Sequence, residues 1–171
     1  MSLSQRAKSY REAADAKFLD PAILKEKALA FKQEGKTIAT LNGSFDLLHA
    51  GHLEMIYQAS LQADLLIVGL NTDRSIQGYK SPLRPIIALE YRLQMMAALE
   101  MVDFVTWFDE LDPRSLLEKI QPDVHVNGEE YGEECIEAQT VRSHGGKIHI
   151  VPLIPGLSTT EILKKIVHTC A

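Results

Sequence analysis

Five short apolar runs alternate with longer amphipathic segments, and this alternation constrains the fold more than any other feature of the chain. The runs read TIATLNG (37–43), ADLLIVGLN (63–71), FVTWF (104–108), PDVHVNG (122–128) and KIHIVPL (147–153). Helical spacing of apolar residues is found in 21–35, 50–62, 88–100, 113–120, 134–144 and 158–168. Strands that alternate with helices predict an α/β fold, with an open, mostly parallel five-stranded sheet, right-handed crossovers and helices on both faces.

The length of the chain fits one domain. A chain of 171 residues can bury a single core but is too short for two domains of ordinary size. The first twenty residues show no strong pattern, so we expect an N-terminal arm over residues 1–20 and one domain over residues 21–171. Pro21 in the first turn and Gly35 after the last turn are expected to bound the first helix of that domain.

Nothing in the sequence suggests export or insertion into a membrane. No apolar run approaches the roughly 20 residues that cross a bilayer, and the charged N-terminal stretch lacks the apolar core of a secretory signal. Cys135 and Cys170 form neither a disulfide framework nor a CxxC metal site. We therefore expect a cytoplasmic protein with two ordinary thiols and no membrane partner.

Charge is unevenly distributed along the chain. Residues 1–36 carry eight Lys/Arg and five Asp/Glu, whereas the remainder carries ten and eighteen. An acidic body argues against nucleic-acid binding, because phosphate backbones are held by clustered cations. The acidic charge is still compatible with one small phosphorylated ligand, because a few backbone amides, local cations and a divalent metal can neutralise it.

The loops that follow the five strands are the expected place for a ligand. In open parallel sheets, ligands bind at the carboxyl ends of the strands, where the strand order reverses. These loops read NGSFDLLHAGH, NTDRSIQGYKSPLRP, FDELDP, NGEEYGEE and IPGLSTT, and they concentrate the Gly, Ser, Thr, Asn and charged residues.

The first loop has the features of a phosphate site, although the chain contains neither GxxxxGK[ST] nor a GxGxxG after the first strand. Gly43 permits a close turn, and Ser44 adds a hydroxyl and an amide. His49 and His52 fall at the start of the next helix, where free amides and the helix dipole favour an anion, and Gly51 leaves room for a phosphate there. The two histidines could instead hold a metal, although no third ligand at suitable spacing is evident. The turn could also have no function.

The loop also resembles the signature of a known family, the HxGH nucleotidyltransferases. Their pattern GxFDxxHxGH is matched by Gly43, Phe45, Asp46, His49, Gly51 and His52. The resemblance covers roughly residues 22–167. It implies a Rossmann-like nucleotidyltransferase fold in which the two histidines bind the triphosphate and stabilise charge on the α-phosphate during in-line displacement. Positioning and electrostatic stabilisation are what such a transfer needs.

Within the family, the chain is most similar to the adenylyltransferases of heptose 1-phosphate. The matching stretches include VGLNTDRS, YKSPLRPI, AALEMVDFV and GLSTTEIL. The resemblance implies catalytic roles for His49, His52, Lys80 and Arg84. It implies nucleotide contacts from Asn42, Gly43, Ser44, Phe45, Gly51, Asn71, Asp73, Arg92, Asn127, Gly128, Ser158, Thr159 and Thr160. It further implies ATP and a sugar phosphate as partners, Mg²⁺ held mainly by the ATP phosphates with no protein ligand assigned, and a homodimer.

Two other functions are compatible with the sequence. One is a cytidylyltransferase of glycerol 3-phosphate or a similar ester, although the Arg-Thr that such enzymes carry before Gly-Ile-Ser-Thr is replaced here by apolar residues ahead of Gly156. The other is a non-catalytic nucleotide-binding module, because heptose enzymes usually show Val-Lys-Gly-Gly-Asp-Tyr where this chain shows Val-Asn-Gly-Glu-Glu-Tyr. That departure, at Asn127, bears on the acceptor pocket. The residues expected to contact the acceptor are Asp109, Glu110, Glu129 and Tyr131.

Overall fold

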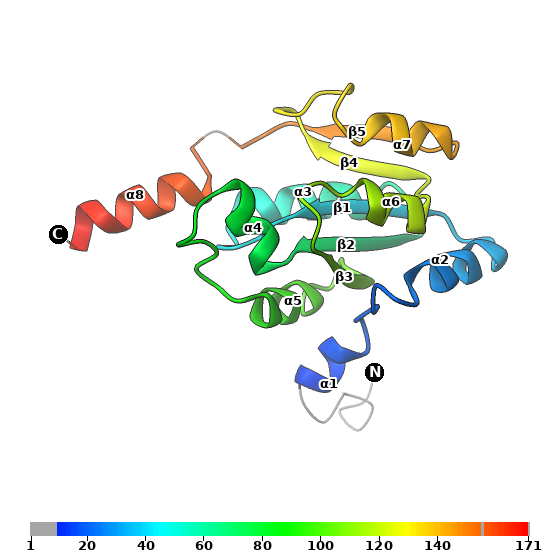
Figure 1. The fold of residues 1–171 in the computed structure, drawn as a ribbon, viewed down its shortest axis with the longest axis horizontal. Coiled ribbons are helices and arrows are strands. Elements are labelled where there is room, and N and C mark those ends of the chain that lie inside the picture. Colours follow the sequence, from blue (N-terminus) through cyan, green and yellow to red (C-terminus); the bar gives the residue numbers. More distant parts are fainter. Residues whose placement is uncertain (1–9, 155, 171) are drawn as a thin grey trace.

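A five-stranded parallel sheet forms the centre of the molecule. The computed structural model describes residues 10–154 and 156–170. The strands are β1 (Ile38–Gly43), β2 (Leu65–Asn71), β3 (Phe104–Phe108), β4 (Val124–Gly128) and β5 (Lys147–Val151). They lie in the order β3-β2-β1-β4-β5 and every pair is parallel (Figure 1). The strand order reverses at β1, between β2 and β4, and the predicted fold class is confirmed.

Eight helices accompany the sheet within the described residues. They are α1 (Tyr10–Asp15), α2 (Leu24–Gln33), α3 (Ala50–Ser60), α4 (Asp73–Tyr79), α5 (Leu89–Ala97), α6 (Arg114–Ile120), α7 (Ala138–Ser143) and α8 (Thr159–Cys170). None of them combines the length and the apolar character that crossing a membrane requires. Figure 1 shows α8 extending away from the sheet, so that its first turn lies beside the body and its far end projects outward.

Three helices depart from the sequence-based expectation. The segment that holds α4 was expected to be a loop, but Thr72 caps it by accepting a hydrogen bond from the Ser75 amide at 3.1 Å. Helix α2 begins three residues after Pro21, which lies in a turn before it. Helix α7 begins at Ala138 instead of residue 134, because the preceding residues form turns.

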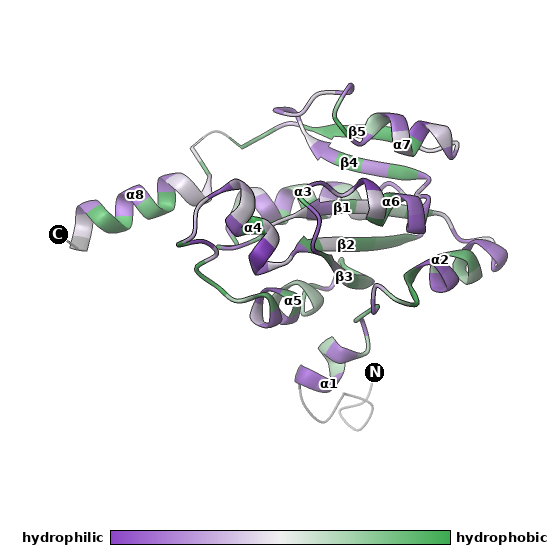
Figure 2. Cartoon of the chain, viewed as in Figure 1, coloured by the Kyte–Doolittle hydropathy of each residue, from purple (hydrophilic) through white to green (hydrophobic). Residues whose placement is uncertain are grey.

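Each face of the sheet is covered by its own apolar cluster. On one face, Leu41, Val68 and Val126 pack with Ile56 of α3 and Met96 of α5. On the other face, residues of β1, β2 and β3 pack with α2 and α6. Figure 2 shows β2 coloured as hydrophobic over most of its length, as expected of a strand buried on both faces.

The described part of the expected N-terminal arm is packed against the domain. Ala14 of α1 and Leu19 are buried, and Phe18 pairs with Val105 beside β3. The ammonium group of Lys17 donates to the carbonyl oxygens of Leu99 and Val102, at 2.9 and 2.6 Å. Residues 1–9 of the arm lie outside the described residues, and a boundary at residue 21 stays a prediction.

A buried histidine of β4, which contacts β1, is expected to make the fold acid-sensitive. His125 is fully buried; its Nδ1 lies 2.8 Å from the Thr40 hydroxyl and its Nε2 has no partner in the described residues. Burial lowers the pKa of His125 from 6.5 to about 3. The unfolded chain therefore takes up a proton at this side chain below about pH 6.5 while the folded chain does not, and the free energy of unfolding falls as the pH drops toward 3.

The histidine contribution can be measured from the pH dependence of urea unfolding. His125→Gln should reduce the slope of the unfolding free energy between pH 6 and pH 4 by up to about 1.4 kcal/mol per pH unit. The control is His144→Gln at an exposed position, which should keep the wild-type slope. Equal slopes for wild type and His125→Gln would contradict the assignment.

Candidate active site

A cavity of about 300 Å³ opens where the carboxyl ends of β1 and β4 meet the start of α8. This is the point of strand-order reversal, where the sequence predicted the site. The cavity brings together fourteen of the predicted residues: Asn42, Gly43, Ser44, Phe45, His49, Gly51, His52, Lys80, Asn127, Gly128, Tyr131, Ser158, Thr159 and Thr160. Loops that are far apart in the sequence thus contribute to one hollow.

The two histidines stack on each other at the floor of the cavity. His49 is the N-cap residue of α3 and has extended backbone, whereas His52 lies in the first turn of that helix. Their ring centroids are 3.8 Å apart and the ring planes differ by 20°. A Cβ atom at Gly51 would lie 3.1 Å from the His49 ring. A side chain at position 51 would therefore crowd the His49 imidazole, in addition to the phosphate that the sequence suggested.

Burial keeps both imidazoles neutral near pH 7. It lowers the pKa of His52 to about 4, an effect to which positive charge on His49 and Lys80 adds. Burial likewise lowers the pKa of His49. A neutral imidazole carries one N–H donor and one acceptor nitrogen. Nδ1 of His49 and Oδ1 of Asn42 are buried in this region without a hydrogen-bond partner among the described residues.

Phe45 supports the histidine pair from the side of β1. Its ring is 3% exposed and meets the His52 ring edge-on, with centroids 5.3 Å apart. The Phe45 backbone has a φ of 43°, a left-handed conformation that costs a non-glycine residue about 1–2 kcal/mol. Packing of the Phe45 ring under His52 offsets that cost, and the conformation lets the chain turn sharply from β1 toward α3.

Lys80 brings a positive charge to the cavity from the end of α4. Its ammonium nitrogen donates to the Ser44 hydroxyl at 2.8 Å and lies 5.6 Å from the centre of the Tyr79 ring. Burial lowers the pKa of Lys80, and the neighbouring Arg84 adds to that effect. The side chain thus connects α4 to the turn after β1 at the place where the sequence predicted a phosphate.

Arg84 is held by Asp46 beside the cavity. Its Nε and Nη2 atoms lie 2.7 and 2.6 Å from Oδ2 of Asp46, whose Oδ1 accepts from the amides of Ile86 and Ile87. Burial alone would raise the pKa of Asp46, but the two amides and Arg84 outweigh it and the pKa is lowered. The carboxylate fastens the segment 84–87 to the signature loop. Arg84 itself is not among the residues that line the cavity.

Arg92 is fully buried and its guanidinium is engaged within the protein. Nε donates to the carbonyl of Ile87 and Nη1 to that of Ser44, at 2.9 and 2.7 Å. Nη2 donates to the carbonyl of Asn71 and to the carboxylate of Asp73, at 2.9 and 2.6 Å. The structure therefore places Arg92 under the site, as a link between the ends of β1 and β2, and does not bring it to the cavity surface.

Other predicted residues also lie away from the cavity. Asn71 and Asp73 bond to Arg92, and the Asn71 amide also donates to the Ser75 hydroxyl at 3.0 Å. Asp109 interacts with the Thr72 hydroxyl and with Arg74. The remaining predicted positions outside the lining are Glu110 and Glu129. Of the four predicted acceptor residues, only Tyr131 lies at the cavity.

The first turn of α8 closes the opposite side of the cavity. The Ser158 hydroxyl accepts from the Glu161 amide at 3.2 Å, which is the bond of an N-cap residue. Thr159 and Thr160 follow as the first two helical residues. Free amides at such a helix start favour an anion, so the Ser158 cap is compatible with an anion-binding role for this stretch.

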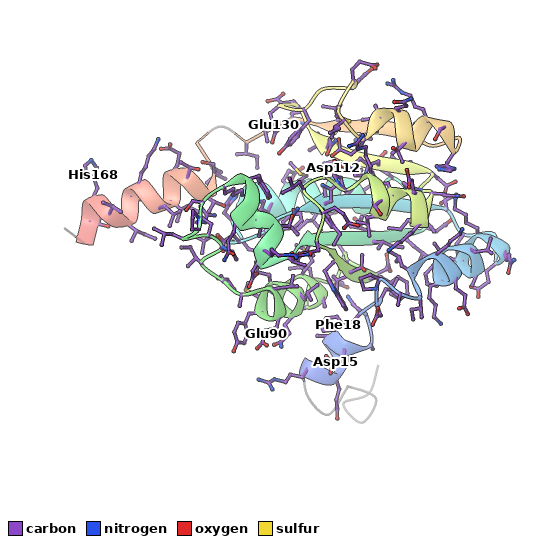
Figure 3. The ribbon with its side chains drawn as sticks, in the orientation of Figure 1. Asp15, Phe18, Glu90, Asp112, Glu130 and His168 are labelled. Atoms are coloured by element: carbon purple, nitrogen blue, oxygen red, sulfur yellow. The ribbon has the colours of Figure 1, made fainter. Side chains whose placement is uncertain are left out.

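The cavity has lining residues that sequence reasoning missed. Six are apolar: Leu41, Met55, Pro152, Leu153, Ile154 and Leu157. Glu130, an acidic residue of the loop that follows β4 (Figure 3), also lines the cavity. The sequence did not indicate that the apolar residues line a cavity, because apolar side chains near a strand are ordinarily assigned to the core. The position of most of them in the loop after the last strand was the available clue.

Protein ligands for a metal are sparse at the site. In the part of the chain that the structure describes, no group of three or more His, Cys, Asp or Glu side chains could hold a metal ion. Glu130 is the one carboxylate among the cavity-lining residues described. A divalent ion bound here would therefore depend mainly on oxygen atoms of a ligand.

Comparison with known sequences identifies relatives over most of the chain. A family model described as cytidylyltransferase-like matches residues 40–165. The bifunctional protein HldE of Methylobacillus flagellatus is 40% identical over 96% of this chain, and that of Geotalea uraniireducens is 42% identical over 90%. The chain spans about a third of these relatives, 34% and 31% of their lengths.

Two solved structures share the fold. One is a lipopolysaccharide core biosynthesis protein from Thermoplasma volcanium, with a TM-score of 0.56, 24% identity, and coverage of 70% of this chain and 98% of that one. The other is a pantoate-beta-alanine ligase from Francisella tularensis, in complex with beta-gamma ATP and beta-alanine. Its TM-score is 0.58 at 18% identity, over 88% of this chain and 77% of the ligase.

Proposed function

The chain belongs to the cytidylyltransferase-like family, and we propose that it is a cytoplasmic adenylyltransferase that transfers AMP from ATP to a sugar 1-phosphate. The phosphate of the acceptor attacks the α-phosphorus of ATP and pyrophosphate leaves, so that the product is an ADP-sugar. We propose a heptose 1-phosphate as the acceptor, because of the resemblance to heptose enzymes and the 40% identity to bifunctional HldE proteins.

One observation carries the proposal. The stacked His49 and His52, the Lys80 ammonium and the first turn of α8 surround one cavity at the point of strand-order reversal. Imidazole N–H groups, an ammonium group and free helix amides are all donors to anionic oxygen. Their convergence suits a triphosphate better than a neutral ligand, and the apolar wall that includes Leu153 and Leu157 is suited to the face of a nucleobase.

The histidines would act by donating hydrogen bonds to the α-phosphate as charge develops there. Transfer of this type needs in-line positioning and electrostatic stabilisation, and no covalent enzyme intermediate is required. Lys80 would neutralise charge on the triphosphate from the α4 side. Mg²⁺ would enter with ATP, bound by its phosphate oxygens, and would neutralise part of their charge.

We also propose that the protein is a homodimer, as the resemblance implies. Exposed apolar side chains on the projecting α8, among them Ile166 and Val167, are compatible with such contacts. Light scattering coupled to gel filtration tests this part of the proposal.

The proposed reaction is tested by pyrophosphate release. The purified protein is incubated with Mg²⁺ and either ATP or CTP, together with a panel of heptose, hexose and polyol phosphates. We expect release with ATP and a heptose 1-phosphate, with at least about a 100-fold lower kcat/KM for CTP. Release that depends on CTP and glycerol 3-phosphate would indicate the cytidylyltransferase, and no release with any acceptor would indicate a nucleotide-binding module.

A further inference from the structure

A buried polar cluster under the end of β4 contains two residues that have no part in the reaction as proposed. Glu137 is 5% exposed, Asn127 5% and Cys135 9%. Across the described residues, the Glu137 carboxylate forms no ion pair. A charge is costly in a protein interior when it has no hydrogen-bonding partners. The neighbours of Glu137 are therefore expected to donate hydrogen bonds to its carboxylate.

Those neighbours are the side chains of Asn127 and Cys135. Nδ2 of Asn127 lies 3.4 Å from Oε2 of Glu137. Burial raises the pKa of the Cys135 thiol, which also forms side-chain hydrogen bonds with Asn127 and Glu137. The thiol is thus protonated near pH 7 and lies beside both side chains.

The cluster fixes the orientation of the Asn127 side chain. A carboxylate only accepts hydrogen bonds, so the nitrogen of Asn127 must face Glu137 and its oxygen must point elsewhere. One N–H group of Asn127 is used by Glu137, and the Cys135 thiol lies beside the same amide. Oδ1 accepts no hydrogen bond from any residue that the structure describes, and Asn127 lines the active-site cavity.

We propose that Glu137 and Cys135 are positioning residues that hold Asn127 with its Oδ1 toward the cavity, where it accepts a hydrogen bond from a hydroxyl of a bound sugar. The inference rests on the proposed function, which supplies two sugar-bearing substrates, a nucleotide with its ribose and an acceptor sugar. The Asn127 side chain offers a donor to Glu137 and an acceptor to a ligand, and it brings no charge to the cavity.

The test reverses the direction of the hydrogen bond between Asn127 and Glu137. Glu137→Gln lets the Asn127 amide turn around, and Asn127→Asp places two carboxylates together. In the double variant, the introduced glutamine can donate to the introduced aspartate, whose second oxygen again faces the cavity. We expect each single change to raise the KM of one substrate by about tenfold with kcat within about twofold, and the double variant to return within about threefold of wild type.

The control is Glu133→Gln, which removes an exposed carboxylate of the same segment and should leave both KM values unchanged. A rise confined to the KM of ATP, and absent with 2′-deoxy-ATP or 3′-deoxy-ATP, identifies the ribose as the source of the hydroxyl. A rise confined to the KM of the sugar phosphate identifies the acceptor. Glu137→Gln kinetics equal to those of Glu133→Gln, or a double variant no better than the singles, would overturn the inference.

A second readout separates this inference from the proposed function. The Asn127 side-chain amide protons should exchange slowly with solvent in wild type and at least about tenfold faster in Glu137→Gln, as measured by NMR. If the wild type turns over no sugar phosphate, the proposed acceptor fails. The orientation of Asn127 is then decided by amide exchange, together with the affinity for ATP and for its deoxy analogues. Unprotected amide protons in the wild type would overturn the inference in either case.

Discussion

Replacing His52 by alanine is expected to lower kcat by at least about 100-fold while the fold remains intact. The loss of one donor to charge that develops in a transition state has this magnitude. His52 stacks on His49 with its pKa lowered to about 4, so at pH 7 it is a neutral donor with a fixed orientation. Alanine removes the N–H donor of His52, and the His49 ring loses the ring on which it stacks.

Steady-state pyrophosphate release, together with circular dichroism, provides the measurement. The control is His144→Ala, a change at an exposed histidine outside the cavity lining, which should keep wild-type kcat. Because the change acts on the transition state, kcat should fall much more than the KM of ATP rises. A folded His52→Ala variant with near-normal kcat would remove the histidine pair from the mechanism.

The strands and the general location of the site were predictable from local sequence. Each apolar run is long enough for one strand, and strands of a parallel sheet that are covered on both faces keep such continuous apolar patterns. Helix α4 was not predictable in the same way. Its sequence, DRSIQGY, includes a glycine and polar residues of low helix propensity, and it depends on the Thr72 cap and on packing against β2.

The roles of individual polar residues were less predictable, because they depend on burial. An arginine is usually exposed, and spacing alone gave no sign that Arg92 would be fully buried among backbone carbonyls. Asp109 was expected to contact the acceptor, but it is held by Arg74 and Thr72 at the start of α4. No sequence motif marks the cluster of Asn127, Cys135 and Glu137, because these residues become neighbours only when the turn before α7 folds back beside β4.

Asp46→Asn is expected to impair both stability and activity, because Asp46 joins the signature loop to the segment that follows Lys80. The fully buried carboxylate accepts from the Ile86 and Ile87 amides and from Arg84. Asparagine can accept from the amides through Oδ1, but its NH₂ group then faces the Arg84 guanidinium, donor against donor. Breaking a buried pair by removing one charge costs about 3–5 kcal/mol, and we expect a loss of this order in the free energy of unfolding.

The loss of activity follows from the position of Lys80. When the segment 84–87 is released, the Lys80 ammonium loses its fixed place over Ser44, and a misplacement of about 1 Å at a reacting centre can cost about 100-fold in rate. We therefore expect kcat/KM to fall by about 100-fold, measured at a temperature where denaturant curves show the variant folded. Asp64→Asn is the matched control: this exposed carboxylate accepts from Thr37 at the amino end of the sheet, so its loss should leave kcat/KM unchanged. An Asp46→Asn protein with the stability and kcat/KM of Asp64→Asn would show that Arg84 and the two amides are held by other contacts.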